Sequence, residues 1–365
     1  MKKAFLLTFF VLNIFVIAYA QNPQKPKDDN LSLNILANAQ TALDNKNYGE
    51  AYKLVQQAQD ARKKEVEWND YVLSKSLKPS QVRKAGDAID DVLKVLKERD
   101  DFDAISIITH WVDLKTKSFF KDSVSNLHKY LLHRIDFPES DFLLGHIYRL
   151  EGEYAISEKY LEKANQNSDM LEIPEMRYDI LYEQAELAYV QGKNPEYFLQ
   201  LIIKNDIYYS DDNLKKAVIR TISSTHDDIA QKFFMLYRVD SPISIKAYYK
   251  LSAFYAANKK PDDALFMNLL GVLSSFTHIN NILLDRNPNY TYTTIESFFY
   301  ELQRYHDVMT WCIDNDFWKG ICTTTLMCKS MGYEVFSKEL LESMSEYCPS
   351  EYWKEDAFQQ LKAYQ

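Results

Sequence analysis

The sequence predicts an all-α fold, specifically an α-solenoid in which antiparallel helix hairpins stack one on the next. Two features of composition favour helices. The 365 residues include 8 glycines and 10 prolines, so the turn residues that separate the strands of a β-sheet protein are scarce. No run of β-branched residues alternates strictly with polar ones, so the two-residue pattern of a β-strand is absent. The third observation is that small residues recur at the spacing that two closely crossing helices require.

The first segment, residues 1–20, is typical of a signal peptide. Lys2 and Lys3 precede an apolar run, and Ala18-Tyr19-Ala20 supplies the small residues of a cleavage site. We expect cleavage before Gln21 and a periplasmic protein; the alternative is an uncleaved anchor, since about 17 mostly apolar residues approach the length of a membrane span. Residues 21–30 are rich in proline, lysine and aspartate and lack large hydrophobes, which predicts a disordered leader.

Residues 31–276 are predicted to form helical hairpins. A hairpin needs a small residue in its first helix, and further small residues in its second helix, wherever the two helices approach closely. Two segments share one spacing of this kind: Gly145, Tyr154, Ser157 and Ala164, and earlier Ala39, Tyr48, Ala51 and Ala58. We therefore interpret them as equivalent units.

Further units follow on the same reasoning. Ala185 and Gly192 match a first helix and its turn, although Tyr197 stands where a small residue is expected. Ala230 and Ala264 are interpreted as equivalent positions of two more units, about 34 residues apart, which is the period of a common helical repeat. Residues 295–365 are predicted to hold C-terminal repeats, with Thr325, Gly332 and Ser337 in the same scheme; a turn-rich composition predicts an irregular connection over residues 277–294.

Together these residues resemble the tetratricopeptide repeat (TPR) family, over roughly two-thirds of the chain that remains after cleavage. The resemblance implies a TPR-like α-solenoid whose concave face binds a protein or peptide partner without catalysis. With its predicted signal peptide, the chain is similar to exported bacterial TPR proteins.

Several classes of chemistry have no support in the sequence. The 52 acidic residues exceed the 43 basic ones, a balance that disfavours nucleic acid as a partner. Glycine-rich phosphate loops, Gly-x-Ser-x-Gly and His-Glu-x-x-His are absent. We therefore expect neither an enzyme, nor a cofactor, nor a metal site, and no integral membrane span once the signal is removed.

The four cysteines are Cys312, Cys322, Cys328 and Cys348, and an oxidising compartment would permit disulfides between them. Cys322 and Cys328 lie about 120° apart around a common helix and should not pair with each other. Two alternatives stay open: Cys312 and Cys348 each bridge to one of them, or all four are buried thiols.

The sequence thus predicts an exported scaffold that binds a protein or peptide of the cell envelope. The alternative is an accessory protein of a solute-uptake system that encloses a small molecule. First helices supply the concave face of such a solenoid, and on that basis the candidate partner-binding residues are His146, Arg149, Tyr182, Glu186, Tyr189, Tyr249 and Lys250.

Overall fold

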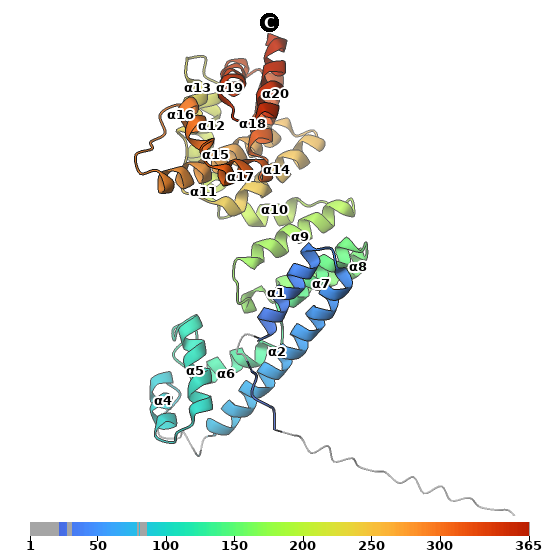
Figure 1. Ribbon diagram of the computed structural model, residues 1–365, viewed down its shortest axis with the longest axis vertical. Coiled ribbons are helices and arrows are strands. Elements are labelled where there is room, and N and C mark those ends of the chain that lie inside the picture. Colours follow the sequence, from blue (N-terminus) through green and yellow to red (C-terminus); the bar gives the residue numbers. More distant parts are fainter. Residues whose placement is uncertain (1–21, 28–30, 79, 81–85, 365) are drawn as a thin grey trace, which may run out of the picture. The chain divides into compact units, whose positions relative to one another are not determined.

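The computed structural model describes residues 22–27, 31–78, 80 and 86–364, and within them it contains helices and no strand (Figure 1). One isolated bridge joins Ala88 and Ser123. The all-α prediction is therefore confirmed. The predicted signal peptide lies outside the described residues. The chain divides into two compact units, residues 1–143 and 144–365, and each is described by itself.

The first unit is built on one long helix. Its helices are α1 (Leu31–Asp44), α2 (Tyr48–Ser76), α4 (Ile89–Lys97), α5 (Phe102–Lys115), α6 (Val124–His133) and the first half of α7 (Pro138–Leu150). α1 and α2 form a hairpin at which Ala39, Ala51 and Ala58 are fully buried, as their spacing predicts. α2 continues beyond this hairpin, and α5 and α6 pack against it.

The second unit begins within α7 and continues with a longer series of helices. These are α8 (Tyr154–Gln166), α9 (Met176–Val190), α10 (Glu196–Ile203), α11 (Ile207–Ser210), α12 (Asp212–Ile222), α13 (Ile229–Phe234), α14 (Pro242–Ala257), α15 (Pro261–Arg286), α16 (Ile295–Leu302), α17 (His306–Asp314), α18 (Phe317–Ser330), α19 (Glu334–Tyr347) and α20 (Glu351–Leu361). Successive pairs α9–α10, α14–α15 and α18–α19 pack as hairpins, and α10 packs against α14 as α15 does against α18.

In three hairpins a hydrogen bond from a serine hydroxyl to a backbone carbonyl lies at the close crossing of the two helices. Ser157 Oγ donates to the carbonyl of Gly145 at 2.7 Å, Ser252 Oγ to that of Ala264 at 2.8 Å, and Ser337 Oγ to that of Thr325 at 2.8 Å. Each pair is 12 residues apart in the chain. A Cβ on Gly145 would lie 2.7 Å from the Leu161 side chain, so the small residue is required for the helices to approach.

The hairpin turns also repeat. Five of them in the described chain hold a residue of positive φ, between 57° and 85°, seven residues after the small residue of the first helix: Lys46, Gly152, Gly192, Lys259 and Gly332. The next N–H donates to the carbonyl five residues earlier, as from Glu153 to Tyr148 and from Tyr333 to Cys328, both at 2.8 Å. This is a Schellman cap, which satisfies the last carbonyls of the first helix.

The α9–α10 hairpin departs from this geometry at Tyr197, as the large side chain at that position suggests. α10 begins four residues after Gly192, whereas α8 begins two residues after Gly152. The longer turn rotates the second helix, so that Tyr197 is 65% exposed and Leu199 is buried instead. Accordingly, a large residue is tolerated at this position.

Two expectations for the repeats are wrong. Ala230 is not equivalent to Ala264, because it lies in the short helix α13 and its N–H bonds to Glu339 of α19. The irregular connection does not begin at residue 277, because α15 continues to Arg286 and leaves only residues 287–294 without helix. The polar residues that suggested a loop are satisfied inside the core: Thr277 Oγ1 donates to Leu273, and Asn280 accepts from Tyr290.

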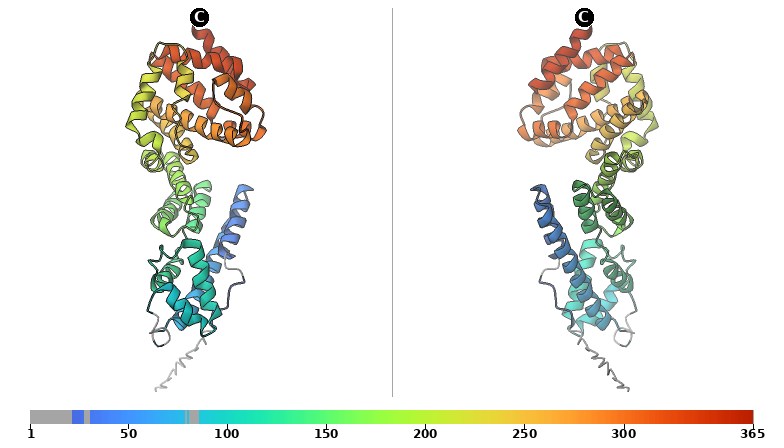
Figure 2. Two further views of the ribbon diagram at one scale, coloured as in Figure 1. Left: turned by 90° about the vertical axis from the view of Figure 1, so that its left-hand side faces the viewer. Right: turned by 90° about the vertical axis from the view of Figure 1, so that its right-hand side faces the viewer.

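Helix α15 is the core of the second unit. Residues 264–277 are all buried, because α14, α18, α11, α13 and α16 pack around it, and Figures 1 and 2 show it among these helices. A helix that is buried on every side belongs to the interior of a larger bundle rather than to the edge of one repeat.

The register of the α14–α15 hairpin can be tested with Ala264→Trp. Ala264 is 1% exposed, so the indole should overpack the crossing and lower the free energy of unfolding by about 1–3 kcal/mol. Urea unfolding followed by circular dichroism measures this loss. Ala257→Trp places the same ring on an exposed position of α14 and should be nearly neutral; equal effects of the two substitutions would contradict the assigned register.

Candidate partner-binding surfaces

Candidate residues of α7 and α9 converge on a carboxylate that the sequence analysis did not identify. Glu183 of α9 is 7% exposed and is 2.7 Å from His146 Nδ1. Arg149 Nε also donates to it, and Arg149 Nη2 donates to its second oxygen at 3.3 Å. His146 and Arg149 therefore act within the fold, where they tie α7 to α9.

A second set of contacts joins α9 to α14. Lys250 Nζ donates to Glu186, and the Tyr182 hydroxyl donates to the carbonyl of Ile243 at 2.6 Å while accepting from the N–H of Ala247 at 3.0 Å. Burial raises the pKa of Tyr182 above its ordinary value. Tyr182, Glu186 and Lys250, all candidates from the sequence, thus form with Glu183 a row of contacts between helices. We call this row the first-helix ladder.

The two remaining candidates have different surroundings. The ring of Tyr249 fills a slot between α15 and α18, since a Cβ on Gly271 or Gly320 would approach it to 2.8 Å and 2.6 Å respectively, and its hydroxyl is 3.2 Å from Ser275 Oγ. Tyr249 is a packing residue. Tyr189, by contrast, is 71% exposed and is available at the end of α9.

Glu183 is charged although it is buried. Burial by itself raises the pKa of a carboxyl group, but the hydrogen bonds from His146 and Arg149 outweigh it and hold the pKa of Glu183 below the ordinary 4.5. The sequence offered one signal for this residue: Glu183 follows Arg149 by 34 residues, the repeat period, so both occupy neighbouring first helices.

An acidic groove lies on the second unit, and none of the residues of the first-helix ladder line it. Two adjoining hollows share Thr294, Glu296, Glu346 and Tyr347, so they form one groove along α16 and α19. Its acidic residues are Asp227, Asp228, Glu296, Glu301, Glu339, Glu342, Glu346 and Glu351. We call this the acidic groove. The sequence analysis did not identify it, because the carboxylates come from four separate segments.

Some of these carboxylates have structural partners and others face solvent. Glu339 accepts from the N–H of Ala230 at 3.0 Å, and Glu301 accepts from Asn287 and Arg304. Glu296 and Glu346 are exposed. Tyr300 is 66% exposed beside them, so aromatic surface accompanies the negative charge.

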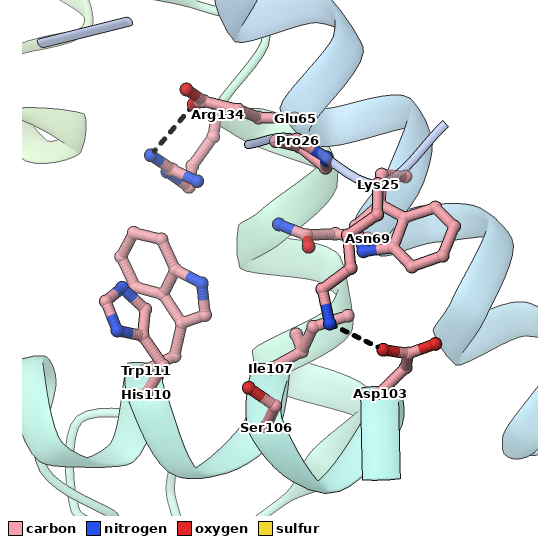
Figure 3. A pocket seen from close by; sticks show the side chains of 11 residues that line it. Lys25, Pro26, Glu65, Asn69, Asp103, Ser106, Ile107, His110, Trp111 and Arg134 are labelled. Atoms are coloured by element: carbon pink, nitrogen blue, oxygen red, sulfur yellow. Dashed lines mark hydrogen bonds and ion pairs between the residues drawn. The ribbon is translucent and has the colours of Figure 1, made fainter. Parts of the chain in front are cut away.

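A small hollow in the first unit is lined by α2, α5 and the leader (Figure 3). Lys25 Nζ lies 2.7 Å from Asp103 Oδ1, and the buried Arg134 lies 3.8 Å from Glu65 with its guanidinium over the Trp111 ring. The space left beside the leader is about 30 Å³, which is room for water and too little for a solute.

The four cysteines are free thiols, and all are buried. The alternative with disulfide bridges from Cys312 and Cys348 is therefore not observed. Burial raises the pKa of Cys328 and of Cys348 to about 12, and it raises the pKa of Cys312 and Cys322 as well.

No group of three or more His, Cys, Asp or Glu side chains among the described residues is placed to hold a metal ion. Among the same residues, no helix has the length and apolar character needed to cross a membrane.

Comparison with known proteins gives one relative at low identity. A protein of Treponema pallidum (strain Nichols), described as an uncharacterized protein, is 24% identical over 332 residues, which cover 89% of this chain and 88% of that protein. No family model matches the chain, and no solved structure matches it. The similarity therefore extends through both units rather than one.

The first-helix ladder predicts a pH-dependent stability. Glu183→Gln removes a buried charge that accepts two hydrogen bonds from Arg149 and lies against His146, so it should lower the free energy of unfolding by about 1–3 kcal/mol at pH 7. Because the pKa of Glu183 is lowered in the folded state, this contribution is complete above the unfolded value and is lost as the pH falls through the folded value. Urea unfolding at pH 7, 5 and 3 measures it.

The matched control is Glu186→Gln on the same helix. Its partner Lys250 is partly exposed, so the loss should be about 1 kcal/mol or less. A deficit of Glu183→Gln that stays constant down to pH 3 would contradict the role given to its charge.

Thiol reactivity gives a separate test. Since the four thiols are buried and burial raises the pKa of each, we expect no reaction with an aromatic disulfide reagent at pH 8 in the native protein, and four equivalents after denaturation. Intact mass should match four reduced cysteines. Fast native labelling, or a mass lower by one or two disulfides, would contradict the burial of these residues.

Proposed function

We propose that the protein is an exported, non-catalytic TPR-like scaffold of the periplasm, which binds a protein or peptide partner of the cell envelope. The repeated crossings and Schellman turns support a TPR-like interpretation, because each follows the residue spacing of that family. A surface made of stacked hairpins presents several helices at once to an extended partner.

The observation that carries the binding proposal is the acidic groove. Its larger hollow is lined by one lysine, Lys354, and by four glutamates, namely Glu296, Glu301, Glu346 and Glu351, and the neighbouring hollow adds Asp227 and Asp228. Opposite charge steers a basic segment toward such a surface and rejects acidic ones. We therefore assign the partner a basic segment, in contact with Glu296, Glu346 and the Tyr300 ring.

The surface proposed for binding thus differs from the one the sequence suggested. Arg149 and Lys250 are engaged with Glu183 and Glu186, so a partner that used them would have to break interhelical contacts. Tyr189 remains exposed and can extend a contact along the hairpins.

The alternative is an accessory protein that encloses a solute. A solute site is expected to be a concave, mostly apolar pocket that covers most of its ligand. The acidic groove is lined largely by charged and amide side chains, and the enclosed hollow beside Trp111 holds only about 30 Å³. Both observations favour the scaffold.

The test compares three baits in a pull-down from the native envelope fraction, quantified by mass spectrometry. Glu296→Lys with Glu346→Lys reverses two exposed charges of the groove and should reduce partner capture by about tenfold. Asp60→Lys with Glu98→Lys makes the same change in net charge on exposed positions of the first unit, and it should capture as the parent does. Capture by the parent should also weaken with added salt.

Two outcomes would count against the proposal. Equal losses with both double variants would show that net charge, and not the groove, governs capture. A low-mass ligand that co-purifies and raises the melting temperature by mass action, with partner capture unaffected by any variant, would favour the solute-binding alternative.

A further inference from the structure

The leader contains a motif that the proposed function does not use. Residues 22–27 read Asn-Pro-Gln-Lys-Pro-Lys, with prolines three residues apart. A proline-rich segment prefers the polyproline II helix, which has three residues per turn, so Pro23 and Pro26 fall on one face. The structure describes this segment without helix or strand and places it against the first unit.

The contacts follow one direction along α2. Pro23 lines a hollow with Tyr71, Ser74 and Lys75, near the C-terminal end of that helix. Pro26 lines the hollow that contains Trp68 and Glu65, nearer the N-terminal end. The leader therefore lies antiparallel to α2, and each proline lines a hollow together with one aromatic residue of that helix.

The two aromatic residues form a continuous surface. Trp68 and Tyr71 are three positions apart, and their ring centroids are 6.1 Å apart. Both are half-buried, so part of each side chain is accessible to a segment that lies on α2. Across from them, α5 contributes Asp103, whose Oδ1 is 2.7 Å from Lys25 Nζ, and Figure 3 shows Lys25 extending from the leader to this carboxylate. We call Trp68, Tyr71 and Asp103 the proline ledge.

We propose that the proline ledge is a binding site for extended Pro-x-Lys-Pro segments, and that the leader fills it intramolecularly. Proline recognition by aromatic surfaces uses a segment that is already extended, so little conformational entropy is lost on binding. The lysine between the prolines reaches Asp103 and fixes the register of the segment. A partner with the same motif must then compete with the leader.

Competition with the leader determines how tightly an added peptide should bind the proline ledge. A short tether gives the leader an effective concentration in the millimolar range, so it occupies the ledge even if its intrinsic affinity is weak. An added peptide should bind the native protein poorly and should bind well once the leader has lost its contacts.

The experiment uses the full mature chain and a fluorescent peptide of residues 22–27, with fluorescence anisotropy as the readout. The leader variant carries Pro23→Ser, Lys25→Ser and Pro26→Ser. It should bind the peptide at least about tenfold more tightly than the parent. Lys27→Ser is the control, since Lys27 lines neither hollow, and it should bind as weakly as the parent.

Substitutions on the ledge locate the site. In the leader variant, Trp68→Ala should weaken peptide binding by about tenfold, and Asp103→Asn should weaken it by about two- to fivefold, as befits a partly exposed ion pair. Circular dichroism melting establishes that each variant is folded. The conservative Asp103→Asn keeps the test decisive if Trp68→Ala unfolds the unit.

The proposal is overturned if the leader variant binds the peptide no better than the parent, or if binding is indifferent to Asp103→Asn. It is overturned as well if a peptide with serine in place of both prolines binds equally well. None of these results depends on the acidic groove, so the two proposals fail separately.

Discussion

The close crossing of two helices within each hairpin is the constraint on which the rest of the structure depends. Where Gly145 meets Leu161 there is no room for a Cβ, and the hydroxyl of Ser157 donates across the same interface. The Schellman turn seven residues later reverses the chain at a fixed distance from this crossing. Because crossing and turn are linked, each hairpin has a defined geometry, and its outer faces are available to pack against the next pair of helices.

Buried charge in this protein serves to join helices. Glu183 stays ionised because Arg149 and His146 surround it, and the first unit contains a comparable group in which Glu65 accepts from the N–H and hydroxyl of Ser32 at 2.9 Å. Removing one member of such a group leaves the other charge without compensation. These positions therefore constrain which helices are neighbours, and surfaces that face a partner must be formed elsewhere.

The sequence predicted the hairpins, but it did not show which candidate binding residues make contacts between helices, and both outcomes have one physical reason. Small residues at a crossing depend on local geometry, so their spacing within about 20 residues of chain is sufficient. Whether Arg149 or Lys250 faces solvent depends on the helix stacked beside it, and Glu186 and Lys250 are 64 residues apart. Spacing within one hairpin does not determine that contact.

Dependence on contacts between distant parts of the chain also explains the other differences between the sequence-based predictions and the structure. Tyr197 was recognised as a departure because it breaks a local rule, whereas the two extra residues of its turn became visible only in three dimensions. Ala230 satisfied the period, but its environment is set by Glu339, 109 residues later. The acidic groove draws on segments from Asp227 to Glu351, so no single stretch of sequence carries its signature.

The burial of α15 has a consequence for how the chain acquires its structure. An array of identical repeats can nucleate anywhere and grow by neighbours, but α15 needs α11 and α13, which precede it, and α16 and α18, which follow it. During synthesis this helix leaves the ribosome before two of its five packing partners, α16 and α18, exist, so part of the segment 264–277, which is buried in the final structure, is still uncovered. We therefore expect the interior around α15 to close only once α18 has been made, so that helices late in the chain determine when this part of the second unit becomes stable.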